Sequence, residues 1–215
     1  MLNEKLEKYL ELLIEKNKVM NLTAIREREE IIDKHFYDSM LLNDLLKEDD
    51  KKIIDIGTGA GFPGLVLAIL NEDKKFLLVD SVKKKIDFIN EVIESLELKN
   101  VETSSERAEE LIKNMREKFD VGLCRGVANL AVILEYEIPF LKVNGRFLAQ
   151  KQNICEVEQA RNALSILKSE IKAIHKFNLP LSKDERVVIE IQKKGKTDKK
   201  YPRKVGIPKK KPLWE

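Results

Sequence analysis

The chain has 215 residues, 43% of them hydrophobic, which is enough for one sizeable core. No run approaches the roughly 20 apolar residues that span a bilayer, and Glu4 and Lys5 charge the amino terminus, so we expect a cytoplasmic protein with no membrane partner. Two isolated cysteines, Cys124 and Cys155, fit neither a disulfide framework nor a zinc site, and we expect no metal.

Charge is distributed unevenly along the chain. Residues 193–215 contain ten basic and two acidic residues, whereas residues 1–192 carry a net charge of −5. This basic segment is rich in Pro and Lys, so we expect a flexible tail there, without a helix or central strand. The expected organisation is a helical extension over 1–48, a core domain over 49–192 and a tail over 193–215.

Helical periodicity marks the first 48 residues. Apolar residues recur at helical spacing from Leu2 to Ile14, with Lys and Glu between them, which predicts an amphipathic helix. A second helical stretch follows over roughly Glu27–Leu46 and carries His35.

From residue 51 onward, the pattern changes to short apolar runs of strand length. Seven such runs are KKIIDIG, KKFLLVD, VETSS, FDVGLC, GRFLAQK, AIHKFNLPL and RVVIEIQKK. A segment of helical period follows each of the first four. This alternation predicts an open, Rossmann-like α/β sheet, mostly parallel and closed by an antiparallel pair with the last strand antiparallel.

The stretch IIDIGTGAGFPG places a glycine-rich turn directly after the first predicted strand. Glycines at the carboxyl end of a parallel strand let the main chain approach a ligand closely. No Gly-Lys-Ser/Thr follows, and Phe62 stands where a dinucleotide fold has its third glycine. The spacing Gly57, Gly59, Gly61, with Asp55 two residues before it, resembles the adenosylmethionine loop of the seven-stranded methyltransferases.

A second carboxylate supports this interpretation. Asp80 ends the strand FLLVD, 23 residues beyond Gly57, near the spacing at which an acidic residue meets the ribose hydroxyls of a bound adenosine. The alternative is a tight turn with two aspartates that only cap helices.

Further segments resemble one family. NLTAIREREEIIDKHFYDS, IIDIGTGAGFPG, LVDSVKKKIDFI, ERAEEL, FDVGLCRGVANL and YPRKVGIPKKKPL, over essentially the whole chain, are similar to the RsmG family, also called GidB. The resemblance implies a seven-stranded class I methyltransferase that uses S-adenosylmethionine, releases S-adenosylhomocysteine and methylates N7 of a guanosine in 16S rRNA. The implied partner is this RNA or the small ribosomal subunit, and we expect a monomer.

The resemblance also implies roles for individual residues. Cofactor contacts would be Gly57, Gly59, Phe62, Ala108, Glu109 and Arg125, with Asp55 and Asp80 as acidic anchors. Asn21, His35 and Arg125 would act at the reacting centre. The resemblance implies RNA contacts by Arg107 and Lys151, and the basic charge of the tail adds Lys199, Lys200, Arg203 and Lys204 as expected RNA contacts. The sequence departs from the family pattern at Gln150, where we expect leucine before Lys151.

The chemistry of the acceptor agrees with this family. Guanine N7 has an in-plane lone pair and no proton, so its methylation is an in-line displacement that needs no general base. Methylation of an exocyclic amine usually needs an Asn/Asp-Pro-Pro-aromatic motif after the fourth strand, where this chain has CRGV.

Other interpretations stay open on sequence alone. His35 and Asn21 also fit a partly buried helix histidine and a helix cap, and Arg107 and Glu109 fit a solvated helix face. The alternative functions are a methyltransferase for a protein or small molecule, and a regulator that binds an adenosine nucleotide without turnover.

Overall fold

The structure, a computed structural model, describes residues 2–214. Seven strands form one sheet in the order β3-β2-β1-β4-β5-β7-β6. They are β1 Lys52–Ile56, β2 Lys75–Val79, β3 Val101–Ser104, β4 Phe119–Arg125, β5 Leu141–Lys151, β6 Ser169–Asn178 and β7 Glu185–Lys193. The last strand, β7, runs antiparallel to β5 and β6, and the other pairings are parallel. The predicted fold class is therefore confirmed.

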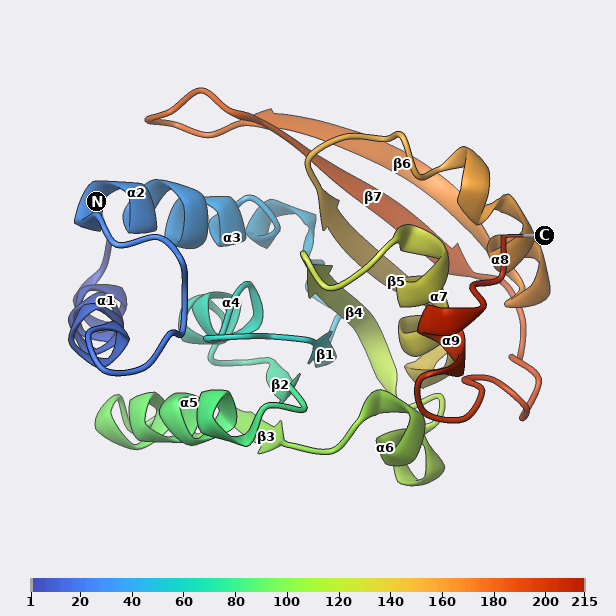
Figure 1. Cartoon of the computed structure of the whole chain (residues 1–215), viewed down its shortest axis with the longest axis horizontal. Coiled ribbons are helices and arrows are strands. Elements are labelled where there is room, and N and C mark those ends of the chain that lie inside the picture. Colours follow the sequence, from blue (N-terminus) through green and yellow to red (C-terminus); the bar gives the residue numbers. More distant parts are fainter. Residues whose placement is uncertain (1, 215) are drawn as a thin grey trace.

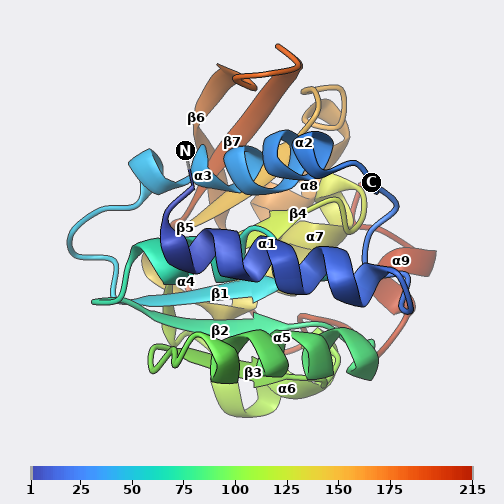
Figure 2. The ribbon, with the colours of Figure 1, turned by 90° about the vertical axis from the view of Figure 1, so that its left-hand side faces the viewer.

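Helices cover both faces of this sheet (Figure 1). One face carries α1 Glu4–Asn17, α4 Gly64–Leu70 and α5 Lys83–Ser95, and Figure 2 views the molecule from this side. The other face carries α6 Ala108–Met115, α7 Leu130–Glu137 and α8 Arg161–Ile166. Short 3₁₀ turns are η2 Asn43–Leu45, η3 Ile138–Phe140 and η4 Glu158–Ala160. None of the helices among residues 2–214 is long and apolar enough to cross a membrane.

Successive side chains of a central strand enter different cores. Ile53 of β1 packs in the core beneath α1, α4 and α5, whereas Ile54 and Ile56 pack beneath α6 and α7. Because both faces of such a strand are buried, its sequence reads as a nearly continuous apolar run. This is why the strands could be recognised from sequence.

The helical extension packs directly on the glycine loop. The face of α1 buries Leu6, Leu10 and Leu13 as its periodicity predicts. Tyr9, on the same face, donates a hydrogen bond of 2.6 Å from its hydroxyl to the carbonyl oxygen of Ala60. The first helix therefore supports the loop that is expected to hold the cofactor.

The second predicted helix has a wider turn in its middle. It comprises α2 Arg28–Ile31, the π-helical segment η1 Ile32–Tyr37 and α3 Asp38–Met40. Buried Asp33 of η1 accepts hydrogen bonds from the amides of Leu181 (3.0 Å) and Ser182 (2.9 Å) in the β6–β7 hairpin. These contacts fix η1 over the end of the sheet, and π-helical turns often occur at functional sites.

Residues 194–214 contain a short helix, which the sequence did not predict, and several buried side chains. After β7 the chain runs back along α6 and α7 (Figure 1), and we call residues 194–214 the C-terminal strap. Tyr201 and Leu213 are buried in the core beneath α7. A short helix, α9 Ile207–Lys210, has Pro208 in its first turn, where the missing proline amide removes no helical hydrogen bond. Composition alone did not predict this packing because few strap residues are apolar, yet some of those few, such as Tyr201 and Leu213, are buried.

One ion pair anchors the strap. Arg203 binds buried Glu135 of α7 through Nε to Oε1 at 2.9 Å and Nη2 to Oε2 at 2.6 Å. Its main-chain amide also donates to Oε1 at 2.7 Å. Such two-pronged contacts are among the stronger polar interactions in proteins.

We therefore expect Arg203→Met to lower the free energy of unfolding by about 3 kcal/mol, because it leaves the carboxylate of Glu135 buried and without its cation. Urea denaturation measures this, with Lys204→Met at the neighbouring exposed position as the control. Equal stability of the two variants would show that the ion pair does not hold the strap.

Candidate functional site

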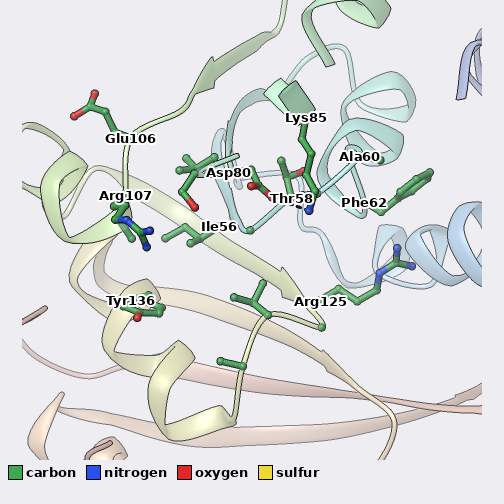
Figure 3. Close-up of a pocket in the computed structure, with 18 of the residues that line it drawn as sticks. Ile56, Thr58, Ala60, Phe62, Asp80, Lys85, Glu106, Arg107, Arg125 and Tyr136 are labelled. Carbon is green, nitrogen blue, oxygen red and sulfur yellow. Dashed lines mark hydrogen bonds and ion pairs between the residues drawn. The ribbon is translucent and has the colours of Figure 1, made fainter. Parts of the chain in front are cut away.

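A cavity of about 500 Å³ lies at the carboxyl ends of β1, β2 and β4, and this volume is typical of small-molecule sites. Figure 3 shows Phe62 and Arg125 at one end and Arg107 and Tyr136 at the other, with Asp80 between them. We call this the first cavity.

The glycine loop forms one wall of the first cavity. Gly57 has φ +78°, and a Cβ there would come within 2.2 Å of Val127 Cγ2. Gly59 has φ +63°. Both positions therefore favour glycine, on conformational grounds and, at Gly57, for lack of space.

Asp80 lines the first cavity and also holds the loop. Its Oδ2 accepts the amide of Gly59 at 3.0 Å, and its Oδ1 accepts the amide of Val82 at 2.9 Å. Lys85 Nζ lies 3.7 Å from Oδ2. Asp80 therefore supports the loop from a position in the cavity; the N-cap residue of α5 is Val82, so the helix-capping alternative is not observed for Asp80.

Asp55, an expected cofactor contact, lies behind the loop instead. It is fully buried, is absent from the lining of the first cavity, and accepts the amide of Gly64 at 2.8 Å through Oδ2. Burial raises the pKa of Asp55 to about 6, although the hydrogen bond from Gly64 opposes this shift. The structure therefore places Asp55 as a support for the turn into α4, because its strand position points into the core.

The far end of the first cavity is formed by the start of α6. Arg107, Ala108 and Glu109 line it; the family resemblance implied Ala108 and Glu109 as cofactor contacts and Arg107 as an RNA contact. Glu109 Oε1 also accepts the amide of Gly206 at 3.1 Å, which ties the C-terminal strap to this end. Tyr136 of α7 completes the wall and was not predicted; burial and the charge of Glu109 raise the pKa of its hydroxyl to about 12. A tyrosine within an apolar helix gave no sequence signal.

Three predicted residues meet at the near end. The ring of His35 stacks on Phe62 with centroids 4.8 Å apart, and the guanidinium of Arg125 lies 5.3 Å from the same ring. Arg125 Nη2 lies 3.1 Å from His35 Nδ1, and Nη1 donates to Asp38 Oδ2 at 3.0 Å and to the Lys34 carbonyl oxygen at 3.0 Å. Residues distant in sequence therefore form one polar cluster.

These contacts define the state of His35. Burial, and next the charge of Arg125, lower the pKa of His35 to about 3, so the ring is neutral at physiological pH. Nδ1 lies 3.1 Å from Arg125 Nη2 and 3.1 Å from the carbonyl oxygen of Lys34. Nε2 lies 2.6 Å from Thr23 Oγ1, so both ring nitrogens have hydrogen-bond partners.

A second cavity of about 530 Å³ adjoins the first, sharing His35, Arg125 and residues 126–128. Lys34, Lys151 and Arg186 add positive charge to its lining. Lys151 Nζ is held by the Ala128 carbonyl oxygen at 2.7 Å and by Glu156 at 2.8 Å.

The carboxylate of Asp38 lies at the centre of a group of polar side chains between the helices and the sheet. Burial raises the pKa of this carboxyl, while Arg125 and Arg186 oppose the shift. Gln150, the departure from the family pattern, donates through Nε2 to Asp38 Oδ1 at 2.6 Å and to the Asp38 carbonyl oxygen at 2.7 Å. The buried amide that replaces the expected leucine is thus paired with Asp38.

Asn21 does not reach the site. Its side chain is exposed and accepts a hydrogen bond from Arg26 at 2.8 Å, and neither cavity includes it. Buried Asn17 instead organises this turn by binding the main chain of residues 22, 23 and 25. The position of Asn17 at the end of α1 was the one signal in the sequence for this role.

The predicted RNA contacts in the strap surround a separate basic depression between α6 and the strap. Lys199, Lys200 and Lys204 are exposed there, beside Lys113. Arg203 also lines this depression, but its guanidinium is bound to Glu135. Among residues 2–214, no cluster of three or more potential metal ligands occurs.

Comparison with known proteins identifies the family. A model described as rRNA small subunit methyltransferase G matches residues 2–187. The chain belongs to this family. It is 64% identical over 211 residues to the ribosomal RNA small subunit methyltransferase G of Fusobacterium nucleatum subsp. nucleatum, an alignment covering 98% of this chain and 91% of the relative. The predicted family is therefore confirmed, and the regulator without turnover is disfavoured because the family consists of methyltransferases.

Solved structures agree on the fold. The ribosomal protein L11 methylase of Lactobacillus delbrueckii subsp. bulgaricus matches with TM-score 0.58 and 16% identity, covering 74% of this chain and 77% of that one. TYW2 of M. jannaschii, solved in complex with AdoMet, matches with TM-score 0.58 and 12% identity, covering 73% and 76%. With the family established, the class I methyltransferase fold and the cofactor S-adenosylmethionine are confirmed.

The neutral state of His35 has a measurable effect on stability. The unfolded histidine has a pKa near 6.5 and the folded one near 3, so the unfolded state binds the extra proton as pH falls below 6.5. The stability that neutral burial allows is therefore present above pH 6.5 and lost on acidification towards pH 3.

We expect the wild type to lose about 2 kcal/mol more unfolding free energy than His35→Gln between pH 8 and pH 5. Urea denaturation at the two pH values measures the difference, and groups common to both proteins cancel. An equal loss of unfolding free energy in the two proteins would mean that His35 titrates in the folded protein as it does in the unfolded chain.

Proposed function

We propose that this protein transfers a methyl group from S-adenosylmethionine to N7 of a guanosine in 16S rRNA, by in-line displacement without a general base. The observation that carries the proposal is the junction of the two cavities at His35 and Arg125. There, the ring nitrogens of His35 are both engaged, Nδ1 with Arg125 and the Lys34 carbonyl oxygen and Nε2 with Thr23.

The first cavity fits the cofactor on grounds of shape and chemistry. Gly57 and Gly59 bring bare main chain to its wall, and Asp80 offers a carboxylate midway along it. In the proposed placement Asp80 binds the ribose hydroxyls, and Ala108, Glu109 and Tyr136 border the adenine. The methionine portion then lies towards Phe62 and Arg125, beside the second cavity.

The second cavity is the proposed site of the target nucleotide. Its cations, including Lys34 and Lys151, suit a phosphate-linked ligand. A base in this cavity would present its edge to the cofactor at the shared wall. Alignment of this kind lowers a reaction barrier by about 7–11 kcal/mol in favourable cases.

The protonation state of the junction favours a ring nitrogen as acceptor. Neutral His35 has no free lone pair in the described contacts, because Nδ1 is engaged by Arg125 and the Lys34 carbonyl oxygen and Nε2 by Thr23. An exocyclic amine would need a group to take its proton. Guanine N7 brings a lone pair and loses no proton, so it matches a site that aligns groups without removing protons.

The RNA is proposed to extend from the second cavity towards the exposed lysines of the strap. Because ribosomal RNA is the substrate, we place the protein in the cytoplasm. Whether the acceptor is free RNA or an assembled subunit can be decided by offering each in the same assay.

The decisive experiment uses labelled S-adenosylmethionine and small subunits from a strain that lacks this enzyme. Borohydride and aniline cleave RNA at 7-methylguanosine, so one enzyme-dependent strand break at a guanosine is the expected result. Label in the RNA without such a break would reject N7, and label in ribosomal protein would favour the protein-methylating alternative.

Asp80→Asn should weaken binding of S-adenosylhomocysteine by roughly ten-fold or more, because hydrogen bonds from hydroxyls to a charged carboxylate contribute about 1.5–3 kcal/mol. Calorimetry measures the change, with Asp87→Asn on the exposed side of α5 as the control. Unchanged affinity would remove Asp80 from the cofactor site.

Replacing Lys199, Lys200 and Lys204 together by Gln should reduce the slope of log affinity for RNA against log salt by about 2 to 3, since each phosphate contact contributes roughly 0.7–0.9. The control replaces three exposed lysines at the amino ends of strands or their loops, Lys52, Lys75 and Lys99. Equal slopes for the two triple variants would show that the strap does not contact phosphates.

A further inference from the structure

We propose that the C-terminal strap is part of the cofactor site, because its Lys209 binds the adenosine half of S-adenosylmethionine. The inference rests on the placement of the adenosine given under the proposed function, and it does not depend on which RNA atom is methylated. Lys209 belongs to α9, is exposed, and lines the first cavity together with Glu109 and Tyr136. The family resemblance implied no cofactor contact in the strap.

The short helix that carries Lys209 is held at both ends. Its N-cap residue, Gly206, has φ +80° and donates its amide to Glu109 Oε1 at 3.1 Å. Just beyond its last residue, the carbonyl oxygen of Lys211 accepts a hydrogen bond of 2.6 Å from Arg203 Nη2. The same guanidinium is bound to α7. The main chain of Lys209 is therefore fixed against α6 and α7, beside the far end of the first cavity.

The carboxylates nearest to the strap are engaged by other cations. Glu135 of α7 binds Arg203. Asp198 Oδ2 lies 3.8 Å from Lys200 Nζ. Among residues 2–214, no carboxylate forms an ion pair with Lys209. Its ammonium group is therefore free to donate to a ligand in the first cavity.

The chemistry of adenine matches the groups that meet at this end of the cavity. Adenine presents ring nitrogens that accept hydrogen bonds next to an amino group that donates them. The ammonium group of Lys209 only donates, and the carboxylate of Glu109 only accepts. A carboxylate has about four acceptor sites, so Glu109 can accept from a ligand as well as from Gly206. One segment of the strap thus supplies the donor and holds the acceptor in place.

The lysines of the strap serve two different surfaces. Lys199, Lys200 and Lys204 line the basic depression, whereas Lys209 lines the first cavity. Glu109 lines both and separates them. We therefore expect removal of the Lys209 charge to weaken cofactor binding even when no RNA is present.

The test is calorimetry of the full chain with two ligands, S-adenosylhomocysteine and 5′-methylthioadenosine, which lacks the amino-acid portion. Lys209→Met should weaken both ligands by roughly five-fold or more, because each loses a hydrogen bond from a charged donor. Lys209→Arg should keep most of the affinity, because it keeps a cation at this position. The control is Lys210→Met at the next residue, which is exposed and does not line the first cavity; its affinities should equal those of the wild type.

Unchanged affinity of Lys209→Met for both ligands would overturn the inference. A loss for S-adenosylhomocysteine alone would also overturn it, because Lys209 would then contact the methionine portion. An equal loss in Lys210→Met would overturn it as well, since the effect would come from the overall charge of the strap. The borohydride and aniline experiment is independent: its failure would reject methylation at N7 and leave the role of Lys209 standing.

Discussion

The carboxylate of Asp38 joins the helical extension to the sheet, and the arrangement of the site depends on it. From one buried position it binds Arg125 at the end of β4, Gln150 at the end of β5 and Arg186 of β7. Burying these charges is unfavourable unless each finds a partner. Because the partners come from three strands, the helix carrying Asp38 can lie in only one register over the sheet, and that register places His35 between the two cavities.

The same interaction determines the chemistry available there. Arg125 is fixed by Asp38, so its second nitrogen faces His35, and burial together with the charge of Arg125 keeps the ring neutral. A neutral, fully hydrogen-bonded histidine positions the reacting groups and excludes water. This suits displacement at a nucleophile that needs no base. Phe62 packs against both groups and separates them from the core.

The sequence predicted the sheet well, because strands buried on both faces show as apolar runs. It also predicted the loop, because a position without room for a side chain, such as Gly57, appears in the sequence as glycine. The sequence was misleading where tertiary packing determines the position of a residue. Asp55 and Asp80 look equivalent in sequence, yet only Asp80 faces the cavity. The strap looked disordered because its few anchors, such as Arg203, are scattered among lysines. Asp38 acquires its role only through partners distant in the chain.

The protonation state of His35 tests the central claim, that burial and Arg125 hold a neutral ring at the junction of the cavities. Nitrogen-15 NMR of labelled histidine in the intact protein reports whether one or both ring nitrogens carry a proton. We expect a single proton on the ring and no titration between pH 5 and pH 8. A doubly protonated ring that appears as pH falls through 6.5 would contradict this claim.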